Sequence, residues 1–141
     1  MTLDSPDDEL GWQSIGPHLA RLESPDVVIF RPIGDVNADE IRQFLAELLK
    51  WPRPVRGFFY LADASRLGHQ SVQIAAEMRN LPPDVFRARA IVGATFQHRV
   101  ADDLMRRAMF RLYHARPHSE ARHFGSEAEA RAWFDSLRTQ G

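Results

Sequence analysis

Residues 56–72 read RGFFYLADASRLGHQSV, and this stretch decides the fold class. The apolar run at residues 58–62 stops at Asp63, a short polar segment follows, and an apolar helical pattern begins near Val72. A short apolar run without alternation is typical of a central parallel strand that is buried on both faces. The stretch therefore predicts a buried strand, a polar loop and a helix N-terminus, which is where α/β domains usually place their binding surfaces.

The rest of the chain adds strands and helices around this unit. Strands are expected where β-branched or alternating apolar residues gather, and helices where apolar residues recur every three to four positions. The predicted strands are His18–Glu23, Val27–Phe30, Arg56–Ala62, Phe86–Thr95 and a short one at about Ala121–Phe124. The predicted helices begin at Asn37, near Val72, at about Gln97 and just after Ser126, and the third of them runs to Tyr113.

This order of elements predicts the architecture. Strands that alternate with helices favour a single α/β domain with a mixed, largely parallel sheet of about five strands, together with four helices and right-handed crossovers. The first two strands form an antiparallel hairpin. The pairs Asn37 with Glu40 and Ser126 with Glu129 have the spacing of capping boxes at the starts of the first and last helices.

Composition limits the classes of function. The 141 residues favour one domain, residues 12–141, after an acidic mobile tail at residues 1–11. The net charge of −1 does not favour binding to nucleic acid or to an anionic membrane. Without cysteine the chain has no disulfide, thiol nucleophile or thiolate metal site. We expect no cofactor, no membrane span and no signal peptide, and by default a cytoplasmic location.

Three segments resemble the SpoIIAA-like family of the STAS and SEC14-related domains. They are DASRL at residues 63–67, FRARAIVG at residues 86–93 and FGSEAEARAWF at residues 124–134. The last segment is the most distinctive, because it combines an aromatic residue, a serine, acidic residues and Glu-Ala-x-x-Trp. The resemblance covers most of residues 18–138 and implies the SpoIIAA-like (STAS) topology.

The resemblance also implies a function. STAS anti-sigma antagonists are regulatory modules that bind protein partners, and phosphorylation of a serine at the start of the helix after this loop controls the binding. In register from Asp63, that position is Val72 in this chain, and Ser71 lies one residue earlier. The SEC14-like side of the resemblance implies a pocket for a lipid or another apolar ligand.

The loop after the third strand supplies the candidate partner and switch residues: Asp63, Ser65, His69 and Ser71. A phosphate on Ser71 would be stabilised by the N–H groups and dipole of the helix, although a plain N-cap is the simpler interpretation. Asp63 and Ser65 suit Asx and Ser turns as well as partner contacts. His69 has no partnered carboxylate or nucleophile nearby in sequence, so it suits a surface position better than a catalytic base.

The third helix has a wider apolar arc than one core face needs. We expect its core face to consist of Leu104, Ala108 and Leu112. A second apolar set either extends the core or forms a pocket wall or a homodimer surface: Met105, Met109, Phe110 and Tyr113.

The same helix is locally basic through Arg106, Arg107 and Arg111. A solvated face with ion pairs between successive turns is the first interpretation, since Asp102 and Asp103 interrupt the basic run. Contact with an anionic ligand or a lipid head group is the second, and nucleic acid is the third.

Three histidines, His114, His118 and His123, gather between the third helix and the last strand. Three imidazoles can hold zinc, but Pro117 breaks the helical spacing of the first two and no Cys joins them, so we predict no metal site. No acid–base pair or activated nucleophile is visible. We therefore predict a non-enzymatic regulatory and protein-interaction module that works through the loop after the third strand. The alternative is a carrier or sensor of a lipid-like or other apolar ligand in a SEC14-like pocket.

Overall fold

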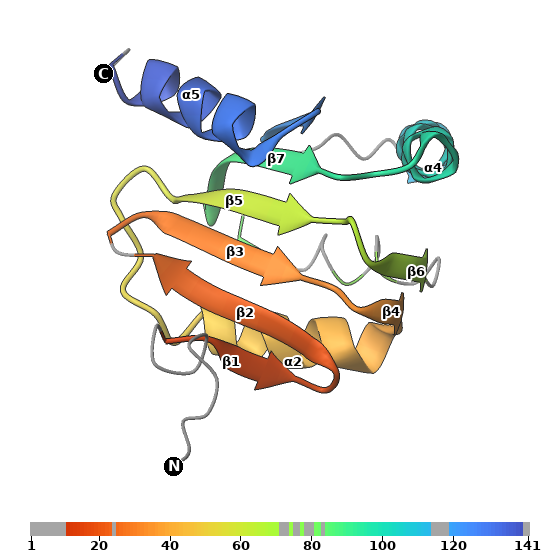
Figure 1. The fold of residues 1–141 in the computed structure, drawn as a ribbon, viewed down its shortest axis with the longest axis horizontal. Coiled ribbons are helices and arrows are strands. Elements are labelled where there is room, and N and C mark those ends of the chain that lie inside the picture. Colours follow the sequence, from red (N-terminus) through yellow and green to blue (C-terminus); the bar gives the residue numbers. More distant parts are fainter. Residues whose placement is uncertain are drawn as a thin grey trace.

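The computed structural model describes residues 11–23, 25–70, 74, 77, 81–82, 84–113 and 119–139. Their main sheet has six strands in the order β1-β2-β3-β5-β7-β8 (Figure 1). The first three strands pair antiparallel, and β3, β5, β7 and β8 pair parallel. The bounds are β1 Gln13–Ile15, β2 His18–Glu23, β3 Val27–Arg31, β5 Phe58–Asp63, β7 Phe86–Val92 and β8 Glu120–Phe124. The mixed, largely parallel sheet is confirmed, and the prediction missed its edge strand β1.

Two glycines shift the strand ends from their predicted places. Gly57 has φ +88° and turns the chain into β5, so Arg56 lies before the strand. Gly93 has φ +75° and ends β7 at Val92, so the strand does not continue to Thr95. A positive φ interrupts the extended backbone that a strand needs.

A second, two-stranded sheet joins β4 (Gly34–Val36) to β6 (Leu67–Gln70) in parallel. It lies beyond the carboxyl ends of β3 and β5 (Figure 1). The Gly34 amide donates to the Arg66 carbonyl at 2.9 Å, and the His69 amide donates to Asp35 Oδ1 at 2.8 Å. The prediction of a plain loop from Asp63 to Val72 is therefore wrong, because Leu67–Gln70 forms a strand that pairs with β4.

The described helices are α2 (Ala38–Leu48), α4 (Phe96–Tyr113) and α5 (Glu127–Arg138). The capping box of Asn37 and Glu40 is present. At α5 the box is incomplete: the Glu129 amide donates to Ser126 Oγ at 3.2 Å, but the Glu129 carboxylate accepts from the Gly125 amide at 3.1 Å. The helix predicted from Val72 lies largely outside the described residues, and Ile74 and Glu77 within it are helical.

The strand register assigns each side chain to one of two sheet faces. Val28, Tyr60, Arg89 and Ala121 are neighbours across β3, β5, β7 and β8, and so share a face. On this face α2 packs over one half of the sheet, where Phe44 stacks on Phe30 with ring centroids 4.5 Å apart.

The opposite face of the sheet is covered by α5. Phe134 stacks on Phe59 with ring centroids 4.7 Å apart. The apolar stripe of α5 faces the sheet: Ala130, Trp133 and Phe134 are buried, and Leu137 packs against them.

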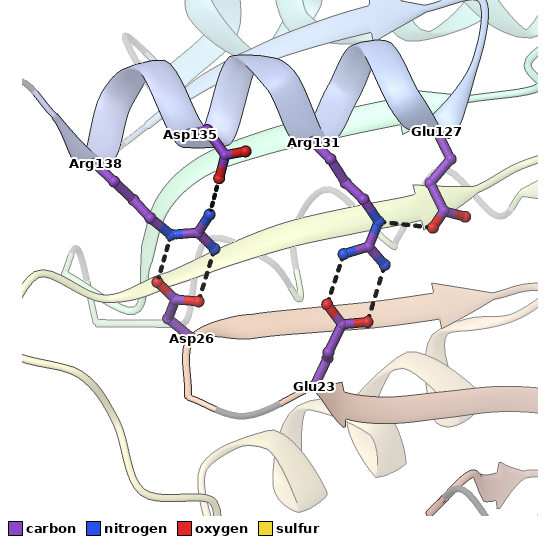
Figure 2. Close-up of polar contacts among 6 residues, drawn as sticks. All are labelled: Glu23, Asp26, Glu127, Arg131, Asp135 and Arg138. Atoms are coloured by element: carbon purple, nitrogen blue, oxygen red, sulfur yellow. Dashed lines mark hydrogen bonds and ion pairs between the residues drawn. The ribbon is translucent and has the colours of Figure 1, made fainter.

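Ion pairs add to the apolar contacts of α5. Figure 2 shows that Arg131 joins α5 to the end of β2 and that Arg138 joins α5 to the turn after β2. Arg131 binds Glu23 with both terminal nitrogens, at 2.6 and 2.9 Å, and Arg138 binds Asp26 at 3.0 and 2.9 Å. These two-point contacts fix the register of α5 across the sheet.

Candidate functional site

The predicted site lies at the carboxyl edge of the sheet, where β5 ends. The Asp63 carboxylate accepts hydrogen bonds from the Ser65 amide at 3.1 Å and from Ser65 Oγ at 2.7 Å. Arg31 Nε lies 3.6 Å from the same carboxylate. The structure thus brings Asp63 and Ser65 together in an Asx turn, with Ser65 exposed to solvent.

The end of β7 holds this turn in place. The Ala64 amide donates to the Val92 carbonyl at 2.8 Å. Gly93 has φ +75° and a Cβ there would lie 3.0 Å from the Ser65 backbone nitrogen, so both the backbone conformation and the close approach favour glycine. The turn is therefore a fixed feature of the edge.

His69 lies on β6 with an exposed side chain. Its neighbour Gly68 links this strand to α4, since the Gly68 carbonyl lies 3.1 Å from His98 Nε2. Ser71 and Val72 lie outside the described residues, so the phosphorylation switch stays a prediction.

Helix α4 lies beyond the carboxyl end of β7, beside β6, and is seen end-on in Figure 1. Its residues His98 and Asp102 lie on the side that faces the sheet. Besides His98, Asp102 is anchored there, with its Oδ2 atom 3.2 Å from His123 Nε2 of β8 and 3.1 Å from Arg106 Nη1. A helix with two polar anchors on one side presents its opposite side outward.

The outward side of the first half of α4 is apolar, whereas Arg107 and Arg111 are exposed on the same side of its second half. Phe96 is 80% exposed, Val100 40% and Leu104 58%, and their spacing of four residues places them in one stripe. The prediction that Leu104 and Ala108 belong to the core is wrong, because both are exposed. The reason is that His98 contacts Gly68 and Asp102 contacts His123. These contacts fix the rotation of α4 about its own axis.

The remaining candidates on α4 have mixed surroundings. Met105 is half-buried and Phe110 is 46% exposed. The side chains of Met109, Leu112 and Tyr113 lie outside the described part of the structure.

The basic residues of α4 are largely engaged with its own acids. Arg106 also lies 3.6 Å from Asp103, and Arg107 Nη2 lies 3.0 Å from Asp103 Oδ2. Arg111 is exposed. The anion contact assigned to these arginines stays a prediction.

His123 is the described member of the histidine group, and His114 and His118 lie outside the described residues. Within the part of the chain that is described, no group of three or more His, Asp or Glu side chains is placed to hold a metal ion. None of the described helices has the length and apolar character needed to cross a membrane.

Two residues near the site were missed by the sequence analysis: Tyr60 and Arg89, neighbours on β5 and β7. Arg89 Nε donates to Ser119 Oγ at 3.1 Å, and its Nη2 donates to the Ser119 carbonyl at 3.0 Å. Burial lowers the pKa of the Arg89 guanidinium and raises the pKa of the Tyr60 phenol. The alternation of β7 predicts that Arg89 faces away from Ala88 and Ala90. Only the strand register shows that Tyr60 is its neighbour on β5.

One solved structure decides the fold. An uncharacterized protein of the DUF3478 family with a SpoIIAA-like fold, from Shewanella loihica PV-4, matches with a TM-score of 0.54 at 18% identity, over 87% of this chain and 93% of that chain. The fold is SpoIIAA-like. The anti-sigma factor antagonist SpoIIAA in its unphosphorylated form also matches, with a TM-score of 0.48 at 12% identity over 91% of this chain and 98% of that one. No protein-family model and no curated protein matches the chain.

The SpoIIAA-like fold expected from the three sequence segments is thus confirmed. At identities this low the likeness shows the fold alone. What this SpoIIAA-like domain does has to be argued from its own surface, where the turn at Asp63, strand β6 and the outward side of α4 lie at one edge.

Proposed function

We propose that this protein is a non-enzymatic regulatory module of the cytoplasm that binds a protein partner at the carboxyl edge of its sheet. The observation that carries the proposal is the exposed apolar stripe of α4, formed by Phe96, Val100 and Leu104. Large apolar side chains that gather on one exposed face are typical of protein–protein contact surfaces.

In this proposal, the neighbouring loop regulates the binding of the partner to the stripe. His98 joins α4 to Gly68, so the helix that carries the stripe and the segment from Asp63 to Gln70 belong to the same edge. A phosphate on Ser65 or Ser71 would add negative charge beside the partner surface, and the resemblance to STAS domains supports Ser71 as the switch position. The partner would then be released or bound according to the phosphorylation state.

The test is affinity capture from the native organism, followed by measurement of the dissociation constant with the purified partner. Leu104→Glu should weaken binding at least about tenfold, because it places a charge on the stripe. The matched control is Val55→Glu, which adds the same charge at a fully exposed residue on another part of the surface. Equal binding by the two variants would contradict the proposal.

The switch has its own variants in the same assay. Ser71→Asp should change the affinity for the captured partner. Ser14→Asp should not, because Ser14 is exposed on the strand at the other edge of the sheet. An unchanged affinity in Ser71→Asp would remove the switch and leave the binding surface standing.

A second candidate function is a carrier or sensor of an apolar ligand between the sheet and α4. It is supported by the half-buried side chains of Ile91 on the sheet and Met105 on α4, while Tyr60, half-buried on the same sheet face as Ile91, packs against Phe44 and Phe86. Native mass spectrometry of the freshly purified protein should then detect a bound small molecule, and its absence would count against this function. If the protein partner is instead a second copy of this chain, the homodimer would form through the apolar arc of α4.

A further inference from the structure

Arg89 is a charged group that forms no ion pair with the described residues. It is half-buried on β7, on the sheet face opposite α5, and its hydrogen bonds go to the hydroxyl and carbonyl of one neutral residue, Ser119. Among the described residues, no carboxylate lies within ion-pair distance of its guanidinium. The guanidinium keeps its charge at all ordinary pH values, and a buried charge is costly unless a counter-charge meets it.

The nearby charges do not resolve this imbalance. Burial is the main cause that lowers the pKa of Arg89, and Arg106 adds repulsion. Asp102 is the carboxylate that attracts it, but Asp102 is already shared by Arg106 and His123.

The sequence leaves few other acids that could approach Arg89. Between residues 11 and 139, the positions outside the described part of the chain contain no Asp or Glu. Glu77, which lies between two of them, is engaged with Arg42 at 3.1 Å. The remaining carboxylates outside the described part of the chain are those of residues 1–10 and the C-terminal carboxylate.

Further polar groups share the face of Arg89. Tyr60 is its neighbour on β5, and His123 is the neighbour of Ile91 two residues along β7. His123 binds Asp102 through Nε2, while its buried Nδ1 has no hydrogen-bond partner. A guanidinium, a phenol and an imidazole together form a donor set suited to oxygen anions.

We propose that Arg89, together with Tyr60 and His123, binds an anionic oxygen group, a phosphate or a carboxylate, on the sheet face beside α4. The site is distinct from the apolar stripe, which lies on the outward side of α4, so it does not depend on the protein partner. The anion site also deepens the second candidate function, because it names the charged end of the apolar ligand. This extension to an amphipathic ligand rests on the proposed function. A free anion would bind in the same way.

The experiment is an NMR titration of the full chain that follows the arginine Nε–Hε signals. Inorganic phosphate and hexanoate are the two probes, acetate is the short-chain comparison for hexanoate, and chloride at equal ionic strength is the reference. The Arg89 signal should shift and saturate with one of the probes. A response to phosphate alone identifies a phosphate group, and tighter binding of hexanoate than of acetate identifies a carboxylate on an apolar chain.

Two variants separate the site from general charge effects. Arg89→Gln should weaken binding of the active probe at least about tenfold. Arg122→Gln should leave it unchanged, because Arg122 lies on the opposite sheet face over Trp133. The titration of the unaltered protein does not depend on either variant folding.

Two outcomes would overturn the proposal. One is the absence of a saturable shift with both probes at millimolar concentration. The other is an Arg89 signal that responds to a probe only after residues 1–10 are deleted, since the acidic tail would then be the natural occupant.

Discussion

At the scale of single residues, His18 shows how one buried polar group can organise its surroundings. It is the only buried polar side chain among the described residues. Its Nδ1 accepts from the Ile33 amide at 2.9 Å, which leaves Nε2 to carry the proton and donate to Glu40 Oε1 at 2.8 Å. The hydrogen bond from His18 is the main cause that lowers the pKa of Glu40. A neutral histidine thus ties β2, the exit of β3 and the start of α2 together.

Glycine geometry gives the first stability prediction. Gly57 and Gly34 both have positive φ, +88° and +76°, but a Cβ at Gly57 would lie 2.5 Å from the Asp84 carbonyl oxygen, whereas a Cβ at Gly34 meets nothing within 4 Å. Gly34→Ala should therefore cost about 1–2 kcal/mol for the backbone conformation alone. Gly57→Ala should cost about 1–3 kcal/mol more because it overpacks. Urea unfolding measures both, and equal losses would contradict the steric argument.

At the scale of elements, the ion pairs of α5 predict a pH dependence (Figure 2). The hydrogen bond from Arg131 is the main cause that lowers the pKa of Glu23 below 4.5. A lowered pKa in the folded state stabilises the fold above the unfolded pKa, and this contribution is lost as the pH falls through the folded value. Arg131→Gln should therefore reduce the free energy of unfolding at pH 7, and the deficit should shrink below about pH 4.

The size of this effect is modest, because Arg131 and Glu23 are 34% and 33% exposed and solvent screens them. We expect about 1 kcal/mol at pH 7. Arg107→Gln is the matched control, since its ion pair with Asp103 joins two turns of the same helix and should contribute about 0.3–0.5 kcal/mol. Urea unfolding at several pH values checks both variants. A deficit for Arg131→Gln that stays constant down to pH 3 would contradict the assignment.

Elements with strong apolar patterns could be predicted from the sequence, and those defined by pairing could not. β2 and α2 were found because their own residues show the period of a strand or a helix. β4 and β6 are three and four residues long, too short for a period, and they exist because the Gly34 and His69 amides find acceptors on segments distant in sequence.

The candidate site was predictable to a similar degree. Asp63 and Ser65 were placed together because a turn is a local arrangement. The rotation of α4 was not predictable, because its two apolar sides are alike in sequence and the choice depends on the anchoring of His98 and Asp102. The role of Arg89 was not predictable, because its lack of an ion pair with the described residues depends on how the strands are paired.

At the scale of the whole molecule, one sheet separates two cores. The core beneath α2 contains Phe30, Phe44 and Phe58, and the core beneath α5 contains Phe59, Leu61 and Phe134. Successive residues of β5 enter opposite cores, so the loss of either core exposes the same strand. The two halves of the molecule should therefore unfold together.

Hydrogen exchange can test this coupling. Phe44→Ala should cost about 3–5 kcal/mol, as a large side chain is removed from a filled core. Because β5 carries both cores, the slowest amides of α5, on the far side of the sheet, should lose the same protection free energy as those of α2. Phe134→Ala, the matched variant of the other core, should lower the protection of α2 in return. The coupling would be contradicted if, in Phe44→Ala, the amides of α2 lost protection while those of α5 kept it. The two cores would then be separate folding units.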